Sequence, residues 1–189
     1  MFSLFGKNKT SQGPLDYKSP AGQARLKGLL HGAKFLYRDT NLSQEVQRLY
    51  AVGTFFRERT MCDATHKFGG VAGNTRFLIV CAAPRNMAAM SAHPEWGLCV
   101  VGANELFKVI DVQRQGELAQ ITVLHVPGDV EMYFRSEEAN RFEPLLLSST
   151  GADFEEACKA APLPEFTTPE WRKRVDHPLG TDLDGKLCA

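Results

Sequence analysis

The stretch ELFKVIDVQRQGELAQITVLHVP, residues 105–127, holds two strand-like runs separated by the polar turn QRQGE. Apolar and polar side chains alternate along both runs, with Ile121 and Val123 on one side of the second run and Gln120 and Thr122 on the other. Alternation with a period of two residues is typical of β-strands. Residues 105–127 therefore predict the clearest β-hairpin of the chain.

Two apolar runs precede this hairpin. TRFLIVCAA, residues 75–83, is rich in apolar and β-branched residues and shows no alternation. A continuous apolar run of this length predicts a strand that is buried on both faces. GLCVVGA, residues 97–103, predicts another short strand.

The glycine-rich stretch KFGGVAGN, residues 67–74, lies directly before the run 75–83. A dinucleotide-binding fingerprint needs its glycines after a strand and before a helix, and a P-loop needs a Gly-Lys-Ser/Thr tripeptide that this chain lacks. Gly-Asn is a common two-residue hairpin turn, so Gly73-Asn74 is expected to join two paired strands. The alternative for this stretch is an anion site formed by Gly69, Gly70 and Arg76.

Helices are expected on both sides of these strands. Ser19 followed by Pro20 is a typical helix start, and the leucines in residues 20–37 recur at helical spacing. A second helix is expected from Asn41 to about residue 53, while residues 50–60 fit a helix or a strand. After the hairpin, helix starts are expected at Ser136, at Ser149 or Thr150, and at Pro169 behind the cap Thr168.

This order of elements predicts an α+β fold. N-terminal helices lead into a four- to five-stranded, mainly antiparallel sheet, and C-terminal helices and an irregular tail follow it. Residues 1–18 are expected to be a flexible N-terminus, and residues 19–165 a single α+β domain. Residues 166–189 are expected to form a C-terminal extension that packs on the domain or trails from it.

Composition argues against several classes of protein. Of the 189 residues, 22 are Lys or Arg and 22 are Asp or Glu, so the formal net charge is zero. Nucleic-acid binders usually carry net positive charge, so no nucleic-acid partner is expected. The strongest apolar run, residues 77–83, is far shorter than the roughly 20 residues that span a bilayer. With no signal peptide in view, we expect a cytoplasmic protein without a membrane span.

The five cysteines are scattered and form no CxxC pair. This pattern predicts reduced thiols and gives no support to a structural zinc site. His66, His93, His125 and Asp111 likewise lack a spacing that would prearrange metal ligands. We therefore expect no metal and no cofactor.

A cysteine nucleophile needs a nearby base. Cys62 lies in the polar segment 57–66 and would share a face with His66 if that segment were helical. Cys81 and Cys99 lie inside apolar strands, where cysteine usually acts as a small core residue. The candidate catalytic residues are His66, Arg76, His93 and Cys62.

The long segment PRNMAAMSAHPEWG, residues 84–97, links two buried strands. Long loops often bind something, and Met and Trp are favoured at protein contact surfaces. Met87, Met90 and Trp96 are therefore candidate partner-binding residues. The other interpretation is that these three side chains cap the core.

The main functional prediction is a small binding or regulatory protein that acts through protein–protein contact without catalysis. An accessory, inhibitor or immunity-type bacterial protein would fit, with a protein partner or a homo-oligomer. The alternative is a small hydrolase or transferase with a site at the sheet edge, built from His66, Arg76 and His93, with or without Cys62. A small-ligand sensor that uses residues 84–97 is a third possibility.

Overall fold

A computed structural model describes residues 16–147, 150–182 and 184–188. The expected flexible segment, residues 1–18, lies mostly outside these ranges. The helices are α1 (Pro20–Gly32), α2 (Gln44–Arg48), α3 (Glu131–Phe134), α4 (Ala139–Leu146), α5 (Thr150–Lys159) and α6 (Pro169–Val175), and the 3-10 turns are η1 (Ala88–Met90), η2 (Pro94–Trp96), η3 (Gly128–Val130) and η4 (Pro164–Phe166). The strands are β1 (Lys34–Thr40), β2 (Phe55–Glu58), β3 (Cys62–Thr65), β4 (Thr75–Cys81), β5 (Arg85–Asn86), β6 (Leu98–Val101), β7 (Glu105–Gln115) and β8 (Leu118–Val126).

β4 lies in the middle of the sheet, and all seven of its residues are buried. Phe77, Ile79 and Cys81 belong to a hydrophobic cluster on one face, whereas Val80 belongs to a cluster on the other. Both faces of β4 are thus covered, which confirms the prediction made from its continuous apolar run.

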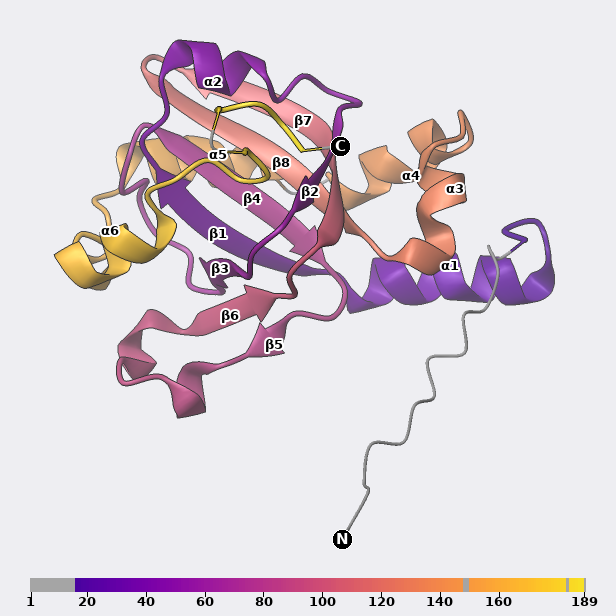
Figure 1. Cartoon of the computed structure of the whole chain (residues 1–189), viewed down its shortest axis with the longest axis horizontal. Coiled ribbons are helices and arrows are strands. Elements are labelled where there is room, and N and C mark those ends of the chain that lie inside the picture. The colour runs from indigo at the N-terminus through magenta and orange to yellow at the C-terminus, as the bar shows by residue number, and fades with distance from the viewer. Residues whose placement is uncertain (1–15, 148–149, 183, 189) are drawn as a thin grey trace, which may run out of the picture.

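The strands of the described residues form one mixed sheet in the order β2-β7-β8-β4-β1-β3-β6-β5 (Figure 1). β4 pairs in parallel with β8, from Thr75 opposite Ala119 to Val80 opposite Leu124. The predicted hairpin is present as β7 and β8, which pair antiparallel with an irregularity between Val109 and Asp111.

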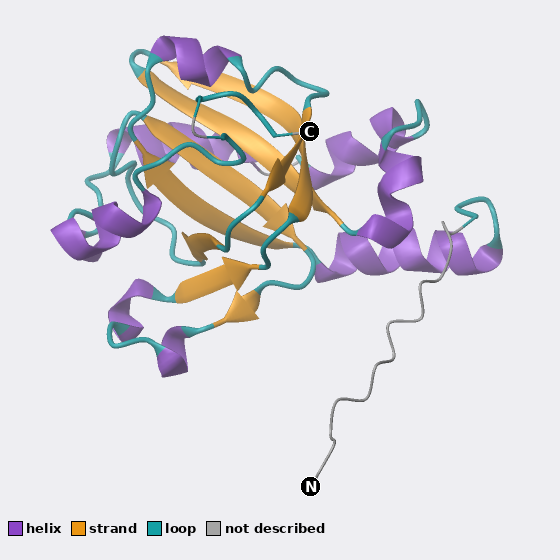
Figure 2. Cartoon of the chain, viewed as in Figure 1, coloured by secondary structure: helices purple, strands orange, loops and turns teal. Residues whose placement is uncertain are grey.

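The predicted sheet of four to five mainly antiparallel strands is wrong: the sheet has eight strands and is mixed. Most of the missing strands are short, such as β3 and β5. The sequence did not indicate β1, because the run of Leu, Ala and Lys residues at the end of α1 continues into this strand and was predicted to be helical. The helix stops at Gly32, and Lys34–Thr40 pairs with β4 over its whole length, so that pairing overrides local helix propensity. The α+β class and the helices at both ends of the chain are present (Figure 2).

The predicted Gly73-Asn74 hairpin turn is wrong as well. Residues 67–72 form no strand, and neither Gly73 nor Asn74 has a positive φ. The Asn74 side chain instead accepts a hydrogen bond from Leu42 N at 2.9 Å and donates one to Leu42 O at 2.9 Å. The neighbours of β4 are therefore β1 and β8, and residues 66–74 form a loop across the end of the sheet.

Helices cover one face of the sheet. Leu26 and Leu29 of α1, Phe134 of α3 and Leu146 of α4 pack in one cluster with sheet residues such as Leu124. Figure 1 shows α1 lying beside α3 and α4 at one end of the sheet. No helix within the described ranges is long and apolar enough to cross a bilayer.

The opposite face is covered by residues 176–182 and 184–188 near the C-terminus, which cross it without helix or regular strand (Figure 1). Leu179 is fully buried, and its carbonyl accepts a hydrogen bond from Tyr50 Oη at 2.7 Å. Gly180 N donates to the buried Glu58 carboxylate at 2.7 Å. Arg38, also buried, donates to His177 Nε2 at 2.9 Å. Polar side chains of the sheet, together with Tyr50 just after α2, thus bind this segment.

A buried ion pair joins β1 to β4. Arg76 and Asp39 are cross-strand partners. Arg76 donates two hydrogen bonds to the Asp39 carboxylate, from Nε to Oδ1 at 2.7 Å and from Nη2 to Oδ2 at 2.8 Å. Two further N–H groups of Arg76 donate to Gly69 O and Gly70 O, each at 3.0 Å. The glycine-rich loop therefore points carbonyl oxygens at a neutralised guanidinium, which is the opposite of an anion site.

Asp39→Asn should destabilise the protein strongly, because it leaves the guanidinium of Arg76 buried without its counter-charge. We expect a loss of about 3–5 kcal/mol in the free energy of unfolding, measured by urea denaturation. Glu138→Gln is the matched control, since the Lys18–Glu138 pair at 3.9 Å is exposed. Its effect should stay within the error of the measurement, because exposed ion pairs contribute little to stability, and equal effects of the two substitutions would contradict the role given to Asp39.

His177 should make the protein sensitive to mild acid. Desolvation of the ring and the nearby Arg38 charge lower the pKa of His177, despite the carboxylates of Glu58, Asp63 and Asp176. The unfolded chain binds the proton more readily, so stability should fall as the pH drops below about 6.5. Thermal melts of His177→Gln between pH 7.5 and 5 should show a smaller loss than wild type, while His31→Gln should match wild type.

Candidate pocket around Cys99 and His66

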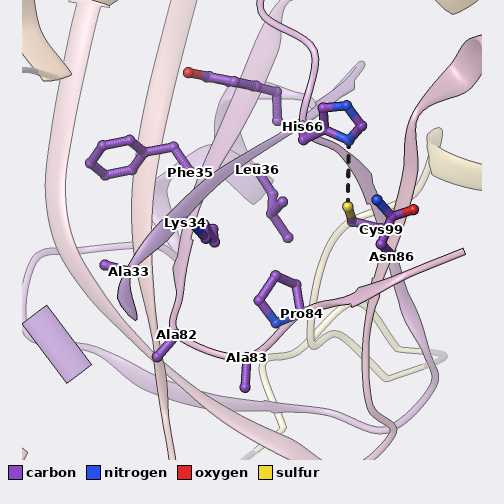
Figure 3. Close-up of a pocket in the computed structure, with 11 residues that line it drawn as sticks. Ala33, Lys34, Phe35, Leu36, His66, Ala82, Ala83, Pro84, Asn86 and Cys99 are labelled. Atoms are coloured by element: carbon purple, nitrogen blue, oxygen red, sulfur yellow. Dashed lines mark hydrogen bonds between the residues drawn. The ribbon is translucent and has the colours of Figure 1, made fainter. Parts of the chain in front are cut away.

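A cavity of about 650 Å³ opens where β1 begins and β4 ends (Figure 3). Its walls are mostly apolar and come from Phe35, Leu36 and the segment 82–84. Cys99 of β6, His66 after β3, Lys34 and Asn86 supply the polar groups. An apolar pocket with a few converging polar groups is the usual form of a small-molecule site.

Cys99 and His66 meet at the wall of this cavity. Strand pairing sets Ala64 opposite Cys99 and Thr65 opposite Leu98, so the residue after β3 reaches the Cys99 side chain. Cys99 Sγ lies 3.7 Å from His66 Nδ1, as the dashed line in Figure 3 shows. The thiol is thus paired with a base, which is the first requirement for a cysteine nucleophile.

Gly97 makes room for the imidazole. A Cβ atom at this position would lie 2.7 Å from His66 Cε1 and 3.1 Å from His66 Nδ1. Gly97 also has a φ of +56° at the end of η2, a conformation that side chains disfavour. Its carbonyl accepts a hydrogen bond from His66 N at 3.4 Å. The absence of a side chain at residue 97 therefore determines where His66 sits.

Burial raises the pKa of the Cys99 thiol, and Cys99 is 4% exposed. At neutral pH the sulfur therefore carries its proton, and a reaction needs His66 to remove it as the new bond forms. The pair is suited to general-base assistance rather than to a standing thiolate.

Asn86 lies beside the thiol. It is the cross-strand partner of Cys99 on β5, and Figure 3 shows its amide next to the sulfur. Asn86 Oδ1 accepts a hydrogen bond from Ala88 N at 2.9 Å, which leaves Nδ2 as a donor toward the cavity. An amide N–H in this place can stabilise negative charge that develops on a substrate oxygen.

A second thiol lies close by in the core. Cys81 Sγ is 3.4 Å from His125 Nδ1, and His125 Nε2 is 3.1 Å from Glu105 Oε2. The order thiol, imidazole, carboxylate has the form of a catalytic triad. However, Cys81 is 0% exposed, and burial raises its pKa to about 11. This sulfur is closed to substrates, so we treat Cys99 as the reactive thiol.

The predicted catalytic residues lie in different places. His66 lines the cavity, whereas Cys62, Arg76 and His93 do not. Cys62 is fully buried in the core, with a pKa raised by burial to about 12. Arg76 forms an ion pair with Asp39. The ring of His93 stacks on that of Trp96, with 4.1 Å between the ring centroids, and its Nδ1 contacts Glu95 Oε1.

The three partner-binding candidates also differ in how deeply they are buried. Trp96 is 4% exposed, and its ring packs against that of Trp171 with 5.4 Å between the ring centroids. Both belong to a cluster that includes Phe166. Met87 lies at the edge of the same cluster, and Met90 is 81% exposed. Residues 84–97 thus place Trp96 in a small core with α6 and leave Met90 on the surface.

Cys99 is the functional candidate that sequence analysis missed, because it lies in an apolar run. The signal that could have found it is the pairing of residues 62–65 with residues 98–101, which is not visible in local patterns. Within the described part of the chain, no group of three His, Cys, Asp or Glu side chains is arranged to hold a metal.

No protein-family model matches this sequence, and no curated protein matches it. Solved structures with a partly similar arrangement include the ADP-ribosyltransferase HopU1 of Pseudomonas syringae pv. tomato, with 15% identity and a TM-score of 0.45 over 50% of this chain and 45% of that chain. The ADP-ribosyltransferase Vis of Vibrio splendidus has 15% identity and a TM-score of 0.43 over 51% and 50%. C3stau2 of Staphylococcus aureus, solved with NAD, has 11% identity and a TM-score of 0.43 over 57% and 72%.

This chain spans about half the length of HopU1 and Vis. Similarity at this level assigns no role to any residue. HopU1 and Vis are nevertheless transferases, and this finding corrects the prediction of a non-catalytic accessory, inhibitor or immunity-type binding protein. The alternative, a small hydrolase or transferase, agrees better with it.

Cys99 should be alkylated by iodoacetamide in the folded protein, whereas Cys62 and Cys81 should not, because both are 0% exposed. Since burial raises the pKa of Cys99, the rate of its alkylation should keep rising with pH beyond the ordinary thiol pKa of about 8.5. Peptide mass spectrometry reads each site separately, with the partly exposed Cys158 as the internal reference. Equal protection of Cys99, Cys62 and Cys81 would contradict an open pocket.

Proposed function

We propose that this protein is a small transferase or hydrolase that uses Cys99 as its nucleophile and His66 as its general base. The observation that carries the proposal is the 3.7 Å contact between Cys99 Sγ and His66 Nδ1 at the wall of the cavity of about 650 Å³. Nucleophile, base and substrate space occur together at this point of the described residues. Catalysis by such a pair depends on this geometry.

The chemistry follows from the two groups. Cys99 Sγ attacks an electrophilic carbonyl carbon, and the S–H proton passes to His66 Nδ1. The bond from that carbon to the leaving group then breaks, and the leaving group takes the proton. Water or an acceptor nucleophile then attacks the thioester carbon, the S–C bond breaks, and Cys99 regains a proton. Water as acceptor makes the protein a hydrolase, and another nucleophile makes it a transferase.

The cavity indicates the class of substrate. Phe35, Leu36 and Pro84 offer apolar contact, while Asn86 and Lys34 offer donors at the wall. A volume of about 650 Å³ suits a small molecule with an apolar body and an activated carbonyl group, such as an ester or thioester.

The test is turnover of p-nitrophenyl acetate and of an acetyl thioester by purified protein. Cys99→Ser should abolish turnover, and His66→Ala should lower it by about 100-fold or more, the usual contribution of a general base. Added imidazole should partly restore His66→Ala, because the space made by Gly97 is then empty. Cys158→Ser is the control and should retain wild-type turnover.

A parallel incubation with NAD, the molecule bound in the C3stau2 structure, extends the test to another donor. Release of nicotinamide that depends on His66 and Cys99 would support a transferase at this pocket that acts at a glycosidic carbon instead of a carbonyl carbon. Turnover of any of these compounds that survives Cys99→Ser would overturn the role given to Cys99. Failure of imidazole to rescue His66→Ala would overturn the role given to His66.

A further inference from the structure

A second hollow, which we call the α2 hollow, lies at the opposite end of β4 from the Cys99 pocket. It has a volume of about 490 Å³ and lies between α2, the loop before β4 and the turn that joins β7 to β8. In contrast to the Cys99 pocket, its walls are mainly polar. It is lined by Leu42, Gln44, Gln47, Arg48, Asn74, Arg114, Gly116 and Glu117.

Two arginines face this hollow without an ion-pair partner. Neither Arg48 nor Arg114 forms a salt bridge with any carboxylate of residues 16–147, 150–182 and 184–188. Glu117 contributes the one carboxylate in the wall. The hollow therefore carries two positive charges against one negative charge.

A chain of hydrogen bonds holds Arg114 in position. Arg114 Nη1 donates to Gln47 Oε1 at 2.6 Å, and Gln47 Nε2 donates to Thr75 Oγ1 at 2.9 Å. Thr75 Oγ1 donates in turn to Asn74 Oδ1 at 2.9 Å. Gln47 is 4% exposed and Thr75 is 0% exposed, so this support is part of the core. One edge of the guanidinium is thus fixed, and its other N–H groups remain available to a ligand.

Such a site suits a doubly charged anion. A guanidinium presents paired N–H groups that match the oxygens of a phosphate or a carboxylate. Two guanidinium groups match the charge of a phosphate monoester, which is close to −2 at pH 7, better than that of a single carboxylate. The volume exceeds that of a phosphate ion, which leaves space for a neutral portion of the ligand.

We propose that the α2 hollow binds a small molecule that carries a phosphate group, through Arg48 and Arg114. The site is independent of the reaction proposed for Cys99. It also differs from the anion site considered at Gly69, Gly70 and Arg76, where the cation is already neutralised by Asp39.

The test is an NMR titration of the full chain with phenyl phosphate, inorganic phosphate and benzoate at matched ionic strength. Phenyl phosphate and inorganic phosphate should bind with dissociation constants of about 1 mM or lower, and benzoate at least about tenfold more weakly. Arg48→Gln and Arg114→Gln should each weaken phenyl phosphate about tenfold. Glu117→Gln should strengthen it, because it removes the opposing charge.

Arg59→Gln is the control, since Arg59 is exposed and lies outside the wall of the hollow. It should leave the phenyl phosphate affinity within about twofold of wild type. Arg48 has no hydrogen-bond partner among the described side chains, so Arg48→Gln should leave the fold intact. Weaker binding by this variant would then report on the site itself. Absence of saturable binding, equal binding of benzoate, or an equal loss in Arg59→Gln would each overturn the proposal.

Discussion

The buried ion pair between Arg76 and Asp39 connects the two central strands of the sheet to the loop that carries His66. It locks β1 to β4 at the centre of the sheet, and the guanidinium fastens the loop that starts at His66 through Gly69 O and Gly70 O. Burying two charges is costly, and here the cost is offset by two short hydrogen bonds between the charged groups and by two more from Arg76 to carbonyl oxygens. These bonds hold the loop that begins at His66, and His66 itself packs against Gly97 and lies beside Cys99.

β4 also organises the functional surface. The Cys99 pocket lies beyond its last residue, Cys81, and the α2 hollow lies before its first residue, Thr75. The two sites differ in chemistry because different elements close the two ends. Apolar residues from β1 and the segment 82–84 shape the first, whereas amides and arginines from α2 and the end of β7 shape the second. Two hollows of different chemical character thus lie at the two ends of the central strand.

Burial limits which thiol can react. Cys62, Cys81 and Cys99 all belong to the hydrophobic cluster on one face of the sheet, and burial raises the pKa of each. Cys81 and Cys99 each contact a histidine, but only Cys99 and its partner His66 line the cavity. A cysteine in an apolar strand is therefore a core residue or a nucleophile according to what faces it.

The sequence by itself determined the elements whose signals are local. The apolar run 75–83, the alternating hairpin 105–127 and the capped starts at Ser19 and Thr168 all appear where they were predicted. Only the tertiary structure decided the eight-stranded mixed sheet, the Arg76–Asp39 pair and the meeting of Cys99 with His66. Those features depend on which strands become neighbours, and strand pairing joins residues far apart in the chain through backbone bonds that no local pattern records.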